Sequence, residues 1–343
     1  MNCGGKDSPK MTTAPANIGA RPAGGMTIGM IGIGDMGGAI ATSLLRNRCD
    51  LVVFDLRPAE VEKFVSQGAR AARSLEALAD ECDVALVVVV DDKQVTSVVS
   101  ELLRHPGRLH SIIVGSTVLP ATVIALEEEA AKQGVSLIDA PVSGGAEKAS
   151  RGIITVVIGG ETAAVDRCRP VFESFGKNLF HMGQLGAGST AKLVNNLLSI
   201  GGNMLHIEAM QLAHAYGLSE DSIVEFVTVS AGDSRTLRTW GRIDRARRSH
   251  YLFGTPAIYE MFSKDVKNAA KAAGQRGVVL PIAATIGASM EEKMKIRDAF
   301  VEEHGMTAPL PRCGICGQEL GFPFRQAGVH PECAYDPEGQ SDR

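Results

Sequence analysis

A glycine-rich turn near the start of the chain constrains its fold more than any other feature. An alternating apolar segment from Thr27 to Ile31 runs into Gly32-x-Gly34-x-x-Gly37, and a helical pattern follows. In a strand–turn–helix unit these glycines permit a tight turn, a close approach of the backbone to a pyrophosphate, and packing of the helix on the strand. The helix amino terminus then faces the phosphates. The pattern predicts a dinucleotide site, although such a turn also occurs without a ligand. Its expected residues are Gly32, Ile33, Gly34, Asp35, Met36 and Gly37.

An acidic residue follows the next apolar strand at the position that a dinucleotide fold requires. LVVFDL (51–56) contains Asp55, which lies 23 residues after Gly32. A carboxylate at this point would hold the ribose 2′-hydroxyl and repel a 2′-phosphate, so Asp55 favours NAD over NADP. Arg57 can neutralise or bind that phosphate, which leaves NADP open.

Three further apolar runs extend the strand–helix alternation: 83–90, 111–117 and 135–142. Continuous apolar runs are typical of strands buried on both faces of a parallel sheet. Because open α/β sheets bind ligands at the carboxyl ends of their strands, we expect Val90, Asp91 and Thr117 to line a cofactor crevice. Asp91 and Asp92 are equally consistent with a solvated helix cap.

The composition limits the functions that need to be considered. A chain of 343 residues suggests two or more domains, and 45% hydrophobic with 22% charged residues is ordinary for a soluble globular protein. A net charge of −4 gives no reason to expect nucleic acid, and no run is long enough to span a membrane. Residues 1–25 are expected to form a disordered tail. Scattered cysteines without a signal peptide favour the reducing cytoplasm.

A second glycine-rich stretch is DAPVSGGAEKASRG (139–152). The Ser143 hydroxyl and the backbone N–H groups of Gly144 and Gly145 form a turn that could grip a carboxylate. A plain loop before a hairpin explains the same residues.

The stretch GAGSTAKLVNN (186–196) has the pattern of a helix start, with Ser-Thr as the expected N-cap. Lys192 then falls in the first turn, at the unfavourable positive end of the helix dipole. Burial and the helix amino terminus would disfavour its charged form and allow it to exchange a proton with a substrate. In isolation, a surface lysine beside a helix cap explains it better. Asn196 lies one turn later on the same face.

Four ordered motifs together resemble one family. G-x-G-x-M-G (32–37), DAPVSGG (139–145), GxGxxxKLxNN (186–196) and SKD (263–265) are similar to those of the β-hydroxyacid dehydrogenases, and the resemblance covers residues 26–300. This group includes 3-hydroxyisobutyrate, tartronate semialdehyde and 6-phosphogluconate dehydrogenases. It implies a Rossmann domain (26–185), a long helix into an all-helical domain (186–305), an active site at the seam, and a homodimer or homotetramer.

The resemblance also assigns roles. It implies that Lys192 is catalytic, that Asn196 hydrogen-bonds the substrate, and that Ser143, Gly144 and Gly145 hold its carboxylate. Lys264 corresponds to a lysine near the nicotinamide, and Thr117 to a threonine that contacts the cofactor. Family members often carry Leu-Pro where this chain has Val90-Asp91, which is a departure on the nicotinamide side.

Two segments add features of their own. The segment 230–254 is rich in arginine, and Arg235 or Arg238 could bind a second anionic group of the substrate or belong to a solvated basic face. Beyond residue 305, Cys313-x-x-Cys316 and His330-x-x-Cys333 have the spacing of a structural zinc knuckle, which the family lacks.

The sequence therefore predicts NAD(P)-dependent oxidation of a small 3-hydroxy acid, or reduction of the corresponding semialdehyde, with zinc in a separate segment. Candidate substrates are 3-hydroxyisobutyrate, glycerate, four-carbon sugar acids, and sulfonate or phosphonate analogues. Two alternatives remain. One is an imine reductase on the same scaffold, although those relatives generally lack the lysine. The other is a non-catalytic module that holds a nucleotide and binds a partner.

Overall fold

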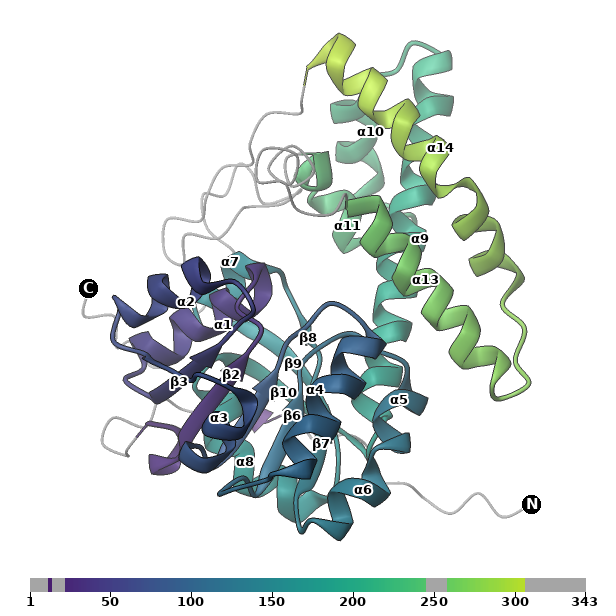
Figure 1. Cartoon of the computed structure of the whole chain (residues 1–343). Helices are drawn as coiled ribbons and strands as arrows, with labels where there is room; N and C mark the ends of the chain where they lie inside the picture. Colours follow the sequence, from purple (N-terminus) through teal and green to yellow (C-terminus); the bar gives the residue numbers. More distant parts are fainter. Residues whose placement is uncertain (1–11, 14–21, 245–257, 306–343) are drawn as a thin grey trace. The chain divides into compact units, whose positions relative to one another are not determined.

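The computed structural model describes residues 12–13, 22–244 and 258–305, and Figure 1 shows the chain's course through them. The chain divides into two compact units, residues 1–194 and 195–343, and each is described by itself. The division falls inside a long helix, α9 (Ala187–Ala215), whereas the boundary expected at residue 186 marks the start of that helix.

A ten-stranded sheet forms the centre of the first unit. Six adjacent strands run parallel, in the spatial order β4-β3-β2-β5-β6-β7. They are β2 (Thr27–Ile31), β3 (Asp50–Phe54), β4 (Arg70–Ala71), β5 (Val84–Val87), β6 (Ser111–Val114) and β7 (Ser136–Asp139). The chain moves outward from β2 to β4 and then returns to place β5 on the other side of β2. This reversal is the topological switch point at which doubly wound sheets bind their ligands.

Four more strands extend the sheet beyond β7: β8 (Val142–Ser143), β9 (Ile154–Gly159), β10 (Gly176–Gly183) and β1 (Thr12–Thr13). β9 runs antiparallel to β7 and β8 and parallel to β10. β1 lies antiparallel to β10, with Thr12 opposite Leu179. Two residues of the expected N-terminal tail therefore pair with the sheet.

Helices cover both faces of this sheet. They are α1 (Asp35–Arg46), α2 (Pro58–Val65), α3 (Leu75–Glu81), α4 (Asp92–Arg104), α5 (Pro120–Ala125), α6 (Glu127–Lys132), α7 (Ala146–Ser150) and α8 (Thr162–Glu173), with a short 3-10 turn at Pro22–Gly25. Within β5, Val84 and Leu86 belong to the core shared with α1 and α8, and Ala85 and Val87 to the core shared with α3 and α4. Burial on two faces explains why this strand is continuously apolar.

The second unit is helical (Figure 1). After α9 it contains α10 (Glu220–Val227), α11 (Arg235–Arg238), α13 (Ile258–Gly274) and α14 (Pro281–His304). One core joins them, in which Met204 of α9 packs with Val224, Leu237, Val266 and Met290. In the described part of the chain, no helix has both the length and the apolar character needed to span a bilayer.

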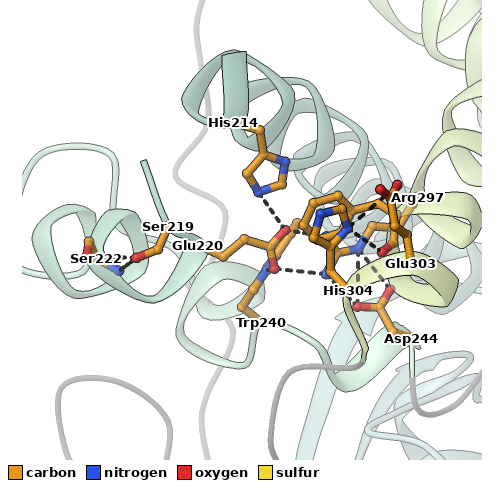
Figure 2. Close-up of polar contacts among 10 residues, drawn as sticks. His214, Ser219, Glu220, Ser222, Trp240, Asp244, Arg297, Glu303 and His304 are labelled. Carbon is orange, nitrogen blue, oxygen red and sulfur yellow. Dashed lines mark hydrogen bonds and ion pairs between the residues drawn. The ribbon is translucent and has the colours of Figure 1, made fainter. Parts of the chain in front are cut away.

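A buried ion-pair network ties the helices of this unit together, and Figure 2 shows it. Arg297 of α14 is 4% exposed, and its guanidinium donates to both Glu220 at the start of α10 and Asp244. The Trp240 indole N–H donates to Glu220 at 2.6 Å, and the guanidinium carbon of Arg297 lies 4.7 Å from the centre of the Trp240 ring. Burial alone would lower the pKa of Arg297, but the bonds to the two carboxylates raise it above its usual value.

Replacing Arg297 with glutamine should lower the free energy of unfolding by about 3 kcal/mol, because two buried carboxylates lose their counter-charge. Lys295→Gln is the matched control on the same helix, since it removes an exposed pair with Glu291 and should leave stability almost unchanged. Urea unfolding followed by circular dichroism measures both. Equal effects of the two substitutions would contradict a stabilising role for the buried network.

Candidate active site

The glycine turn after β2 contains two glycines that the chain's own packing demands and one that it does not. Gly32 has φ +82°, and a Cβ there would lie 2.3 Å from the Val88 carbonyl oxygen. A Cβ on Gly37 would lie 1.9 Å from the Gly32 oxygen. Among the residues that the structure describes, a Cβ on Gly34 would meet only the guanidinium of Arg57, at an ordinary 3.7 Å. The open side of Gly34 therefore fits an external group that approaches the backbone closely, as a pyrophosphate does.

The other residues of the turn have separate roles. The Ile33 side chain is buried in the core, so only its backbone belongs to the turn surface. Asp35 and Met36 begin α1, with Asp35 exposed and Met36 half-buried. The helix amino terminus follows the open glycine directly, which is the arrangement that binds phosphate.

Asp55 follows β3 and is held by protein donors. Its carboxylate accepts the backbone N–H of Ile33 at 2.9 Å, the backbone N–H of Arg57 at 2.9 Å, and the Arg57 guanidinium at 3.0 and 3.2 Å. Burial alone would raise the pKa of Asp55, but the hydrogen bonds from Arg57 and Ile33 lower it overall, so the carboxylate stays ionised at neutral pH. The Arg57 side chain is 58% exposed. The structure thus brings together the glycine turn, the acidic residue and the arginine.

The ends of β5 and β6 carry the remaining cofactor candidates. Val90 is 65% exposed, and Thr117 is half-buried just after β6. Asp91 caps α4 by accepting the Gln94 backbone N–H at 2.9 Å, which is the helix-cap alternative expected from the sequence. Asp92 accepts the Leu119 backbone N–H at 2.9 Å.

Ser116 joins these two strand ends and was not singled out from the sequence. Its hydroxyl accepts the Val89 backbone N–H and donates to the Val89 carbonyl, both at 2.8 Å. The only local signal for it is its place in the Ser116-Thr117 pair that ends an apolar run.

The second glycine stretch lies beside β9. Ser143 ends β8 opposite Thr155, and Gly144 and Gly145 have φ values of +143° and +83° before α7 begins. These conformations are rare for residues with side chains, so both glycines are required by the backbone. A short helix stands between the two antiparallel strands, and the segment is therefore more than a simple hairpin loop.

The start of α9 differs from the expectation of a Ser-Thr N-cap. The helix begins at Ala187, so Ser189 and Thr190 lie inside it and Lys192 lies in its second turn. The carboxylate of Asp139, at the end of β7, accepts the backbone N–H groups of Gly186 at 2.8 Å and of Ser189 at 2.5 Å. A distant carboxylate has replaced the local hydroxyl as the cap. Lys192 is half-buried.

Asn196 is fixed by a contact that the sequence did not reveal. Its Nδ2 donates to Asp265 Oδ2 of α13 at 2.7 Å, and its Oδ1 accepts from Asn195 at 3.2 Å. These two hydrogen bonds set the orientation of the amide and use one of the two hydrogens on Nδ2. Lys264 precedes Asp265 on α13, and its Nζ lies 3.7 Å from Asp265 Oδ1.

The two arginine candidates for a second substrate anion differ in their surroundings. Arg238 is paired with Asp233, and that hydrogen bond raises the pKa of Arg238. Arg235 begins α11 and is exposed. The pairing of Arg238 leaves Arg235 as the better candidate for an incoming anion.

The predicted zinc ligands Cys313, Cys316, His330 and Cys333 lie outside the described residues. Within the described ranges, no cluster of histidine, cysteine and acidic side chains has the arrangement of a metal site.

Each of the two units matches a known family model. A family model for the NAD-binding domain of 6-phosphogluconate dehydrogenase matches residues 27–183. A second model, for the NAD-binding region of NADP-dependent 3-hydroxyisobutyrate dehydrogenase, matches residues 186–308.

Two curated relatives are similar to this chain in sequence over most of their own length. An NAD-dependent L-serine dehydrogenase of Pseudomonas aeruginosa is 35% identical over 72% of this chain and 85% of its own. The 2-(hydroxymethyl)glutarate dehydrogenase of Eubacterium barkeri is 31% identical over 75% and 85%. The crystal structure of 3-hydroxyisobutyrate dehydrogenase from Salmonella typhimurium superimposes with a TM-score of 0.65 at 30% identity, covering 80% of this chain and 94% of that one. This chain belongs to the β-hydroxyacid dehydrogenase family.

Proposed function

We propose that this protein is an NAD(P)-dependent dehydrogenase that oxidises a small 3-hydroxy acid at its CH–OH carbon, or reduces the corresponding semialdehyde. The observation that carries the proposal is the pair Lys192 and Asn196, one turn apart on α9, with the Asn196 amide held by Asp265. The relatives' substrates support the class, since serine and 2-(hydroxymethyl)glutarate both bear a hydroxyl on the carbon β to a carboxylate.

The residues around the glycine turn fit a nicotinamide dinucleotide. The open backbone at Gly34 and the α1 amino terminus would hold the pyrophosphate, and Asp55 would accept from the ribose. Val90, Asp91 and Thr117 at the strand ends, and Lys264 on α13, complete the proposed contacts. A nicotinamide dinucleotide held by these residues would supply the hydride acceptor for oxidation, or the hydride donor for reduction.

The remaining chemistry belongs to the protein's own side chains. Lys192 takes the hydroxyl proton as the alcohol is oxidised and returns it in the reverse direction. The second N–H of Asn196 donates to the reacting oxygen and so orients the hydroxyl, whose proton goes to Lys192. Ser143, Gly144 and Gly145 hold the substrate carboxylate, and Arg235 meets any second anionic group.

The alternative functions have less support. An imine reductase from Myxococcus stipitatus shares the fold, with a TM-score of 0.56 at 17% identity, and this likeness concerns the fold alone. The retained Lys192 favours a dehydrogenase. A non-catalytic nucleotide-holding module would not need Lys192 together with an oriented Asn196.

Three further features are part of the proposal. Leu198, Leu205 and Leu212 recur every seven residues on α9 and are 63–73% exposed, an apolar row suited to a homodimer or homotetramer. A structural zinc at Cys313, Cys316, His330 and Cys333 stays a prediction. The cytoplasmic location also stays a prediction.

Lys192→Ala should lower kcat by about 10²–10⁴-fold, since the proton then lacks a positioned acceptor. Lys132→Ala, which removes an exposed lysine paired with Glu128, is the control and should leave kcat unchanged. Steady-state oxidation of a panel of 3-hydroxy acids, followed by NADH absorbance, measures the rates. Cofactor affinity, measured by fluorescence titration, should not change. Wild-type turnover by the Lys192 variant would refute the acid–base assignment.

Gly34→Ala should weaken cofactor binding by on the order of tenfold, or about 1.4 kcal/mol, while leaving the melting temperature unaltered. A methyl group there makes only an ordinary contact with Arg57 among the described residues but would obstruct the pyrophosphate. Gly37→Ala should instead destabilise the fold by about 1–3 kcal/mol, because its Cβ overlaps the Gly32 carbonyl. Calorimetric titration and thermal unfolding separate the two effects. A loss of stability in Gly34→Ala without a loss of affinity would contradict the site.

Asp55→Asn should reduce the preference for NAD over NADP by about tenfold or more, because the carboxylate no longer repels a 2′-phosphate. Arg57→Ala should change the ratio in the opposite direction, since it removes the cation and releases the Asp55 oxygens for the ribose hydroxyls. Asp50→Asn, at the other end of β3, is the charge-matched control. The measured quantity is kcat/KM for each cofactor. An unchanged ratio in Asp55→Asn would show that another residue selects the cofactor.

A further inference from the structure

Asp139 is a completely buried carboxylate to which no role has been assigned in substrate or cofactor binding. It is 0% exposed and ends β7. Burial raises its pKa, and this effect is opposed by the backbone hydrogen bonds from Ser189 and Gly186. Each carboxylate oxygen accepts one N–H from the start of α9. The carboxylate therefore satisfies two of the amide groups that a helix leaves unpaired at its amino terminus.

The surrounding backbone packs closely around this carboxylate. A Cβ on Gly159 of β9 would lie 2.3 Å from Asp139 Oδ1 and 2.7 Å from the Gly188 nitrogen. A Cβ on Gly188 of α9 would lie 2.6 Å from the Asp139 carbonyl oxygen and 2.7 Å from that of Val157. Two glycines thus allow the helix start to contact the ends of β7 and β9 directly, and Asp139 fixes its place along them.

Two segments of the candidate site start from this contact. Along the strand, Ala140 and Pro141 lead to β8 and the turn Ser143-Gly144-Gly145. Along the helix, Lys192 lies three residues beyond Ser189, on an adjoining part of the same helix surface. The side chain of Asp139 therefore connects the predicted carboxylate grip to the helix that carries the predicted acid–base group.

We propose that Asp139 is a positioning residue for the reaction: it fixes the start of α9 against β7 and thereby sets Lys192 relative to Ser143, Gly144 and Gly145. This inference rests on the proposed function, in which Lys192 exchanges the substrate proton. Reacting groups must be held within about 1 Å, and a displacement of that size can cost on the order of 10²-fold in rate. Loss of the cap should therefore reduce turnover more than it reduces ligand binding.

The test substitution is Asp139→Asn in the full-length protein. It keeps the side-chain size but points an NH2 group at one of the two amide donors. We expect kcat, normalised to the fraction of enzyme that binds cofactor, to fall at least tenfold, with the cofactor dissociation constant unchanged within twofold. Ser74→Ala is the matched control, because Ser74 caps α3 of the same unit through a comparable bond to Ala77 and should keep normal kcat.

A double-substitution cycle shows whether Asp139 acts through the lysine. In a Lys192→Ala background, Asp139→Asn should reduce the residual rate by no more than twofold, whereas a general structural role would give the same reduction as in the wild-type background. Retention of kcat in Asp139→Asn, or multiplicative effects in the cycle, would overturn the positioning role.

Two controls separate this inference from the function on which it rests. Should Asp139→Asn fail to bind cofactor, Asp139→Ser is the second variant. Loss of binding in both would show that the carboxylate is structural only and would overturn the proposal. Wild-type turnover by Lys192→Ala would instead refute the proposed function. Loss of turnover in Lys192→Ala with normal turnover in Asp139→Asn would refute the positioning role alone.

Discussion

The amino terminus of α9 meets the ends of β7 and β9 inside the first unit, where two backbone amides share one buried carboxylate. A helix start placed in a core needs partners for its amide groups, and water cannot supply them there. Asp139 meets this requirement, and Gly159 and Gly188 provide the room. Lys192 follows on the same helix, in the second turn after this contact.

The cofactor side depends on a different constraint, which is the switch point between β2 and β5. The parallel order brings the carboxyl ends of several strands to one edge, so residues far apart in sequence become neighbours. Asp55 reaches the Ile33 amide, and Ser116 joins β6 to the residues after β5. Gly34 remains open amid this dense network of contacts, and that difference from Gly32 and Gly37 is the physical argument for a ligand.

Much of this architecture could be predicted from the sequence, because the signals are local. The glycine turn, the run 83–90 and the alternating segment before Gly32 specify strand, turn and buried parallel sheet without knowledge of distant residues. The strand itself ends at Val87, earlier than its apolar run, because Val89 bonds the Ser116 hydroxyl instead of continuing the ladder. Hydrophobicity alone does not distinguish the residues of β5 from the apolar residues that follow it in the run 83–90.

The contacts that orient the candidate site were beyond such reasoning. Asp139 reaches amides 47 and 50 residues later, and Asn196 pairs with a carboxylate 69 residues away. A helix cap is sought among the nearest polar side chains, and Ser189 and Thr190 were the obvious choice. They lie within the helix because a carboxylate from β7 already occupies the capping position.

The Asp139 contact also determines where the chain can be divided. A fragment ending at residue 185, the end of the dinucleotide domain expected from the sequence, would lack both amide donors and expose the glycine-lined surface at the ends of β7 and β9. A fragment continuing through Val194 would retain them, together with the first two turns of α9. Any attempt to produce the nucleotide-binding half alone should therefore treat those turns as part of its core.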